Sequence, residues 1–184
     1  PEGLFFPETY AFDPGASDLD IMRRAYQTMQ ATLANLWAER DPEIELESAY
    51  EALILASIIE KETGLASERK HISGVFMNRL NIGMRLQTDP TVIYGMGASY
   101  NGNIRRKDLK NDTPYNTYTR FGLPPTPISL PGKAAIEAAL HPLATEALYF
   151  VAKGDGSGGH RFSKTLTEHN KAVKMYLQAL RKSG

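Results

Sequence analysis

The sequence contains no cysteine, no excess of charge of either sign and no long apolar run. Without cysteine the chain cannot form disulfides, thiolate metal sites or iron–sulfur clusters, and it has no cysteine nucleophile. Its 21 basic residues balance its 21 acidic residues, so no overall field attracts nucleic acid or an anionic membrane. The longest apolar run, 53–59 (LILASII), is much shorter than the roughly 20 residues of a membrane-spanning helix.

The length and composition favour one globular domain. A chain of 184 residues, 42% of them hydrophobic, is long enough to bury its own core. The chain starts at Pro1, without Met and without a basic–apolar leader. We therefore expect a piece of a longer protein, with any anchor or targeting segment upstream.

The spacing of apolar residues predicts a mainly helical α+β fold. Helices are predicted at five places: 18–39, 47–63, 67–80, 132–140 and a last one opening at Thr165. Two short runs, 147–152 and 160–162, predict the strands of a hairpin with its turn at 155–159. The segment 84–131 is rich in Gly, Pro, Asn, Thr and Tyr and shows little periodicity. It predicts a long irregular insert of the kind that often carries function.

The string SIIEKET, at the end of the second predicted helix, holds two candidate acids. Glu60 and Glu62 are rotated about 200° apart on a helix and cannot both face one site. The bulkier apolar ridge lies beneath Glu62 and consists of Leu55, Ile58 and Ile59. A carboxyl held against apolar surface has a raised pKa, which suits general-acid catalysis near neutral pH. The alternative is that both glutamates are solvated residues of a last helical turn.

The irregular insert concentrates polar and aromatic side chains of the kind that line sugar sites. They are Gln87, Asp89, Tyr94, Tyr100, Asn101, Tyr115, Asn116 and Tyr118. Aromatic faces pack on the apolar faces of sugar rings, while amides satisfy hydroxyl and N-acetyl groups. The alternative is that the tyrosines anchor loops, and that Asp89 bonds to its own backbone in an Asp-Pro turn.

No metal site or cofactor is expected. The four histidines are His71, His141, His160 and His169, and they form no HExxH motif and no close ligand pair. The glycines at 95–97 and 154–159 match neither a phosphate loop nor a dinucleotide fingerprint. A GxSxG elbow that would locate a serine nucleophile is also missing.

Longer strings carry more information than composition does. In chain order they are 56–63 (ASIIEKET), 75–80 (VFMNRL), 83–95 (GMRLQTDPTVIYG), 115–118 (YNTY), 122–125 (GLPP), 141–142 (HP), 148–152 (LYFVA) and 159–162 (GHRF). Together they resemble the MltG (YceG-like) family of endolytic murein transglycosylases. The resemblance covers the family's catalytic region, without the N-terminal membrane helix and LysM-like subdomain that such proteins carry.

The resemblance implies a lysozyme-like fold in which residues 1–184 form a single catalytic domain. It implies a bacterial enzyme, held by an anchor outside this chain at the periplasmic face of the inner membrane. The expected partner is the peptidoglycan glycan strand, and the family also suggests peptidoglycan synthases. Neither nucleic acid nor a cofactor is implied.

The resemblance also implies a reaction and its residues. Family members cleave the β-1,4 bond between N-acetylmuramic acid and N-acetylglucosamine without water, leaving a 1,6-anhydromuramyl end. The family's catalytic glutamate falls on Glu62, with Glu60 as the second choice. One carboxyl would act first as general acid and then as base. The expected substrate-binding residues are Gln87, Asp89, Tyr94, Tyr115, Asn116, Tyr118 and His160.

Two other functions stay open on the sequence. One is a hydrolytic muramidase that pairs Glu62 with a second acid, such as Asp89 or Glu8. The other is a non-catalytic domain that binds glycan as a scaffold of the cell-wall machinery. The reaction products distinguish the muramidase from a lyase, because a hydrolase leaves a free reducing end and a lyase leaves an anhydro end. A Glu62→Gln variant that loses turnover but still binds glycan would argue against the scaffold.

Overall fold

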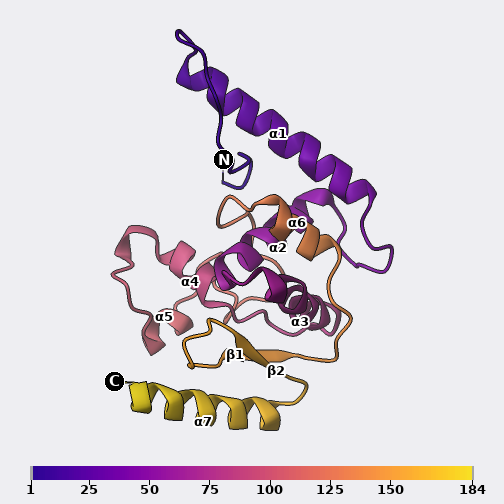
Figure 1. The fold of residues 1–184 in the computed structure, drawn as a ribbon. Helices are drawn as coiled ribbons and strands as arrows, with labels where there is room; N and C mark the ends of the chain where they lie inside the picture. The colour runs from indigo at the N-terminus through magenta and orange to yellow at the C-terminus, as the bar shows by residue number, and fades with distance from the viewer. Residues whose placement is uncertain (1, 184) are drawn as a thin grey trace.

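A computed structural model gives the fold of the chain and describes residues 2–183. The helices and strands are, in chain order, α1 (Asp18–Ala38), α2 (Ala49–Glu62), η1 (Ala66–Glu68), α3 (Arg69–Asn81), α4 (Asp89–Met96), η2 (Gly97–Ser99), α5 (Arg106–Lys110), α6 (Lys133–Leu140), β1 (Tyr149–Ala152), β2 (His160–Ser163) and α7 (Leu166–Ser183). Figure 1 shows them stacked in layers, with α1 at the top, α2, α3 and α6 in the middle, then the hairpin and α7. The predicted α+β class is confirmed.

Side chains at the helix starts explain where the helices begin. Ser17 and Asp20 form a reciprocal capping box at the start of α1. Thr165 and Glu168 exchange the same two hydrogen bonds at the start of α7. Each pair satisfies backbone N–H groups that have no partner inside the helix. Both starts agree with the sequence prediction.

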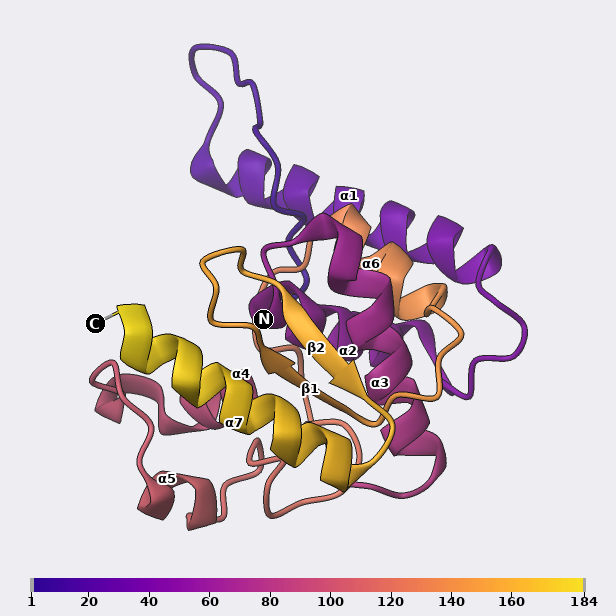
Figure 2. The same ribbon diagram turned by 60° about the horizontal axis from the view of Figure 1, so that its bottom comes forward.

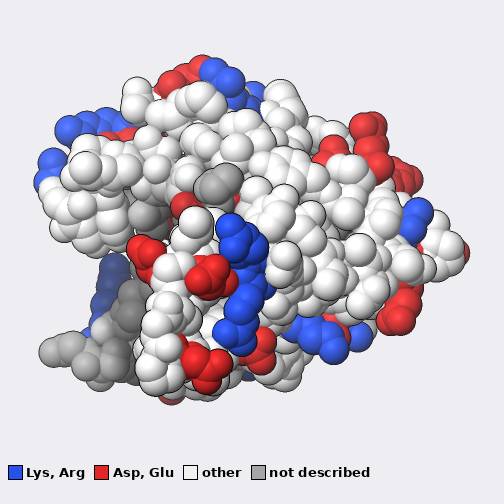
Figure 3. Space-filling model, turned by 90° about the horizontal axis from the view of Figure 1, so that it is seen from above, with Lys and Arg blue, Asp and Glu red and all other residues white. Residues whose placement is uncertain are grey.

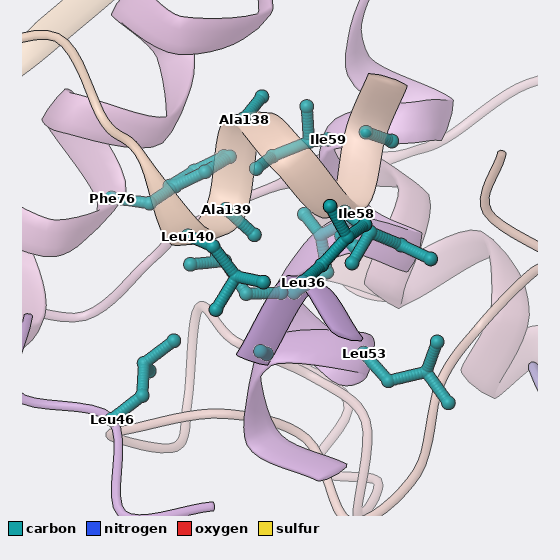
Figure 4. Packing of buried hydrophobic residues seen from close by; sticks show 14 of the residues in the cluster. Leu36, Leu46, Leu53, Ile58, Ile59, Phe76, Ala138, Ala139 and Leu140 are labelled. Atoms are coloured by element: carbon teal, nitrogen blue, oxygen red, sulfur yellow. The ribbon is translucent and has the colours of Figure 1, made fainter. Parts of the chain in front are cut away.

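The core is built around α2, which is buried on every side from Ala52 to Ile59. Its main neighbour is α6, and α1 and α3 pack on its other faces. Figure 4 shows Leu53, Ile58 and Ile59 of α2 among side chains of the neighbouring elements, including Leu36, Phe76 and Leu140. Because these apolar side chains are buried, the direction of α2 is fixed, and so is the position of Glu62 at its end.

The hairpin packs beneath the layer of α2, α3 and α6, and α7 covers its other side. β1 and β2 pair antiparallel, with Phe150 opposite Phe162. The ring of Phe150 meets Phe76 of α3 edge-on at 5.8 Å between centroids. α7 packs along the other side of the hairpin, as Figure 2 shows. The hairpin is thus held between the core and the last helix.

The segment 84–131 is less irregular than the sequence suggested. It contains the helices α4 and α5 and the 3-10 turn η2. Pro90 stands in the first turn of α4, where a proline is favoured because its fixed φ suits the helix and its N–H is not needed. The alternative interpretation of this pair as an Asp-Pro turn is therefore wrong. The remainder of the segment consists of turns and extended chain.

The surface carries no single-sign field on the face seen from above. Figure 3 shows acidic and basic side chains interspersed there, with broad uncharged areas between them. This agrees with the zero net charge. Within residues 2–183, every helix is too short or too polar to cross a bilayer.

Candidate active site

Glu62 is the last residue of α2, and its side chain lines a pocket of about 200 Å³. The three residues of its predicted ridge, Leu55, Ile58 and Ile59, are all fully buried. Burial raises the pKa of the Glu62 carboxyl, and the negative charge of Asp89 adds to this effect. A hydrogen bond from Thr88 and the electrostatic effects of His160 and Arg79 oppose it, without cancelling it. The site therefore favours the protonated carboxyl.

Glu60 faces away from this pocket. Its Oε2 accepts a hydrogen bond at 3.0 Å from the backbone N–H of Gly132, the residue that caps α6. A carboxylate at a helix N-terminus also interacts favourably with the helix dipole. The two glutamates thus lie on different faces of α2, as the helical spacing predicted, and Glu60 has a contact that explains its presence.

A buried cluster of threonine hydroxyls holds Thr88, the hydrogen-bond donor to Glu62, in place. The hydroxyl of Thr88 donates to Oε1 of Glu62 at 2.6 Å. The backbone N–H of Thr88 donates to the hydroxyl of Thr117 at 3.1 Å. Thr91 completes the cluster, with its hydroxyl 2.8 Å from that of Thr117. The insert therefore supplies a fixed donor to the carboxyl through groups that are themselves bonded.

Gln87, beside this cluster, has a strained backbone. It is the one residue other than glycine between 2 and 183 with a positive φ, at 50°. Its N–H donates to the carbonyl of Thr117 at 3.1 Å, and its exposed side chain lines the pocket. Residues other than glycine rarely adopt this backbone conformation. Where they do, the site is often functional and the surrounding structure holds the strained backbone in place.

Asp89 and Tyr118 form a second polar pair in the pocket. The hydroxyl of Tyr118 donates to Oδ1 of Asp89 at 2.6 Å. Burial raises the pKa of the Tyr118 hydroxyl, and its hydrogen bond to Asp89 raises it further. Tyr118 therefore stays protonated as a donor, and one carboxylate oxygen of Asp89 is occupied by it.

Arg79 is a pocket residue that the sequence analysis missed. This buried guanidinium donates to the carbonyls of Leu148 at 2.6 Å and Leu86 at 2.7 Å. It also lies over the ring of Tyr149, 5.3 Å from the centroid. The chain just after α3 and the start of the hairpin thus fix one positive charge near Glu62. No local pattern marks it, because its role depends on remote carbonyls.

His160, at the start of β2, also lines the pocket. Its Nδ1 lies 2.7 Å from Oε2 of Glu68, another residue that the sequence analysis did not single out. The His160 ring meets Phe150 edge-on, with 5.5 Å between centroids. The hairpin thus places an imidazole opposite the end of α2.

The structure brings some of the sequence candidates together and separates others. Those that line the pocket are Glu62, Gln87, Asp89, Tyr118 and His160. Tyr94 and Tyr115 lie outside its lining and pack against each other, with 4.7 Å between ring centroids. Asn116 is buried, and its amide donates to the carbonyls of residues 108, 109 and 111.

The acid Glu8 is also outside the pocket lining. It lies exposed in the N-terminal segment, which joins α1 through a hydrogen bond from Phe6 N–H to the Ala25 carbonyl. Between residues 2 and 183, no three acidic or histidine side chains lie together as a metal site would need. The pocket residues can supply one carboxyl with a raised pKa, a fixed cation, a second carboxylate and neutral donors.

Comparisons with known proteins agree on one family. Residues 1–175 match the model of the YceG-like family. The chain is 42% identical over 179 residues to the endolytic murein transglycosylase of Bacillus subtilis (strain 168), covering 97% of the chain and 48% of that protein. The protein of the same name from Streptococcus pneumoniae serotype 2 is 32% identical over 155 residues, which make up 82% of the chain and 28% of the relative.

A solved structure extends the likeness to the fold. A YceG-like protein from Listeria monocytogenes superposes with a TM-score of 0.79 at 41% identity. The match covers 92% of the chain and 54% of the Listeria chain. The chain therefore spans about half the length of this structure and of the Bacillus relative, and less of the pneumococcal one.

Proposed function

Because this chain belongs to the YceG-like family, we propose that it is the catalytic domain of an endolytic murein transglycosylase. It cleaves the β-1,4 bond between N-acetylmuramic acid and N-acetylglucosamine inside peptidoglycan strands. The product carries a 1,6-anhydromuramyl end. The observation that carries this proposal is the Glu62 carboxyl at the end of α2, whose pKa is raised by burial and which lines the pocket.

In the first step Glu62 acts as a general acid. Its proton goes to the glycosidic oxygen as the bond to C1 of the muramyl sugar breaks, and C1 takes on oxocarbenium character. The carboxylate that remains is stabilised by the Thr88 hydroxyl at 2.6 Å and by the nearby positive charge of Arg79. These groups are already held in place, so they need no reorganisation when the charge appears.

In the second step the same carboxylate acts as a base. It accepts the proton of the muramyl C6 hydroxyl, whose oxygen attacks C1 and closes the 1,6-anhydro ring. The nucleophile belongs to the same sugar, so no bound water has to be positioned. Proton and bond counts balance, and Glu62 ends the cycle protonated. One carboxyl is therefore sufficient for both steps.

The other pocket residues bind and orient the glycan. Gln87 and His160 offer polar groups at the pocket wall, and Tyr118 with Asp89 forms a fixed hydroxyl–carboxylate pair. For Tyr94, Tyr115 and Asn116 we propose a supporting role. Asn116 accepts the Tyr118 N–H at 2.9 Å, and so holds a residue that faces the glycan.

The test is mass spectrometry of peptidoglycan digested by the wild type, by Glu62→Gln and by Glu60→Gln. We expect muropeptides lighter than the hydrolytic products by one water, about 18 Da, from the wild type and from Glu60→Gln only. The Glu60 variant is the matched control, since it lies on the same helix two residues away. Loss of product with Glu60→Gln alone would contradict the assignment of Glu62.

A hydrolytic muramidase is the second candidate, because Asp89 lies in the same pocket as Glu62. In that reaction Asp89 would activate a water or act as nucleophile. Products with a free reducing end would favour it. A glycan-binding scaffold would bind strands in both the wild type and Glu62→Gln and would release no product from either.

The proposed setting follows from the same relatives. Peptidoglycan lies outside the cytoplasm, so the domain acts at the outer side of the cytoplasmic membrane. Peptidoglycan synthases are proposed partners, because newly made strands are the substrate. An anchor in a part of the protein outside this chain would hold it there.

A further inference from the structure

Glu68 contacts His160 at two points. Nδ1 of His160 lies 2.7 Å from Oε2 of Glu68, and the His160 backbone N–H donates to Oε1 at 3.0 Å. Both side chains are largely enclosed, with 13% of the histidine and 15% of the glutamate exposed. Glu68 ends η1 and His160 begins β2, so this contact joins the helical layer to the hairpin.

The contact decides where the imidazole carries its hydrogen. Burial opposes ionisation of Glu68, but two hydrogen bonds from His160, together with the electrostatic effects of His160 and Lys153, outweigh it and lower the Glu68 pKa. An ionised carboxylate only accepts hydrogen bonds, so Nδ1 must carry a hydrogen. In the neutral ring Nε2 is then a bare acceptor.

Nε2 is on the opposite edge of the ring from Glu68. Within residues 2–183 it has no hydrogen-bond partner, although His160 lines the pocket that holds Glu62. The charged groups around the imidazole are Glu62 from α2, Glu68 from η1 and, through Glu68, Lys153 after β1. Phe150 and Phe162 limit the tilt of the ring.

On the basis of the proposed function, we propose that Glu68 is a positioning residue that fixes the Nδ1–H form of His160. Nε2 then accepts a hydrogen bond from a hydroxyl group of the glycan sugar bound beside Glu62. The pocket thereby combines a donor acid at the end of α2 with a fixed acceptor on the hairpin. A sugar hydroxyl between them is held in one orientation.

The first test is the imidazole nitrogen spectrum of His160 in the wild type. Two-bond proton–nitrogen correlations, recorded at a pH where the ring is neutral, should show hydrogen on Nδ1 and none on Nε2. The signal is assigned by its loss in His160→Gln. A spectrum of the Nε2–H form would overturn the proposal, and this result is independent of whether any glycan is cleaved.

The second test is Glu68→Gln. Both His160 groups facing residue 68 are donors, and a glutamine amide offers only one oxygen to accept them. The ring is therefore expected to shift toward the Nε2–H form, in which the pocket-facing nitrogen donates instead of accepting. We expect kcat/KM on peptidoglycan to fall about 10- to 100-fold. Glu137→Gln, which alters an exposed ion pair on α6, is the control and should change neither readout.

Measurements of glycan binding test the role of Glu68 and His160 independently of the proposed reaction. In a Glu62→Gln background, which cannot turn over, purified glycan strands should shift the Nε2 resonance of His160. Adding Glu68→Gln should weaken their Kd about tenfold. If the ring changes to the Nε2–H form while binding and kcat/KM stay at wild-type values, the acceptor role is wrong. If strands bind as expected but no anhydro product forms, only the proposed reaction fails.

Discussion

The hydroxyl of Thr88 donates a hydrogen bond to Oε1 of Glu62 across 2.6 Å. Thr88 is buried and its own N–H is bonded to Thr117, so this donor cannot turn away to water. A hydrogen bond to the ionised form lowers the pKa of a carboxyl, while burial raises it. Burial is the larger effect at Glu62, and the balance leaves its pKa raised.

Removing this hydroxyl in Thr88→Val should raise the Glu62 pKa further. Activity that requires the protonated acid is lost as the pH rises through that pKa, so the alkaline limb of the pH–rate profile should move to higher pH. The second step loses a donor to its carboxylate, and kcat should fall about tenfold. The measurement is kcat against pH. A limb that moves to lower pH would contradict the role of Thr88.

The Asp89→Asn variant should shift the alkaline limb of the pH–rate profile in the opposite direction. The negative charge of Asp89 raises the Glu62 pKa, so its removal lowers that pKa and moves the alkaline limb to lower pH. The asparagine oxygen can still accept the Tyr118 hydroxyl, which keeps the pair's geometry. Rate profiles of both variants, recorded side by side, check the signs. Complete loss of cleavage at every pH would instead favour Asp89 as a second catalytic carboxylate.

Glu62→Gln should make the protein more stable at neutral pH while abolishing cleavage. The folded state binds the Glu62 proton more tightly than the unfolded state does, because the folded pKa is raised. Stability from this group is therefore full below the unfolded pKa and is lost as pH rises through the folded one. Removing the charge should add about 0.5–2 kcal/mol at neutral pH. Urea denaturation at neutral and acidic pH should show this gain shrinking in acid.

Asn116→Ala should reduce stability more than glycan binding. The amide of Asn116 satisfies three backbone carbonyls, and its oxygen accepts the Tyr118 N–H. Leaving these groups without partners should cost about 2–3 kcal/mol. Asn101→Ala, at an exposed position of the same insert, should cost almost nothing. A large rise in KM with unchanged unfolding would mean that Asn116 contacts the glycan directly.

Gly74→Ala tests how closely α3 approaches the chain that leads to the hairpin. A Cβ at residue 74 would lie 2.3 Å from the carbonyl oxygen of Leu143 and 2.9 Å from Cγ2 of Thr145. Backbone cannot move aside as a flexible side chain can, so the expected loss is about 2–3 kcal/mol. Gly64→Ala, which would meet no atom within 4 Å, is the control. Equal unfolding free energies for the two variants would contradict this packing.

The sequence predicted the parts of the site that depend on local periodicity. The helical spacing placed Glu60 and Glu62 on different faces, and the apolar ridge led to Glu62. The helix α4 was missed because an Asp-Pro pair is typical both of a turn and of a helix start. Its eight residues are also too few for a clear period.

The parts that were missed depend on contacts between distant segments. Arg79 is fixed by carbonyls that follow it by up to 69 residues, and Glu68 meets His160 across 92 residues. Tyr115 and Asn116 match the insert's sugar-binding composition, yet their side chains bond to Thr126 and to backbone carbonyls. Composition describes a segment's chemistry, whereas the direction of each side chain depends on the packed fold.

The position of His160 and Phe150 on the hairpin has a consequence for the synthesis of the protein. The acid at residue 62 is translated long before the strands that form the opposite wall of its pocket. A ribosome-bound chain that ends before residue 160 contains the carboxyl but lacks the wall that β2 supplies. The complete pocket therefore exists only after nearly the whole domain has been synthesised, and the proposed cleavage needs an almost finished chain.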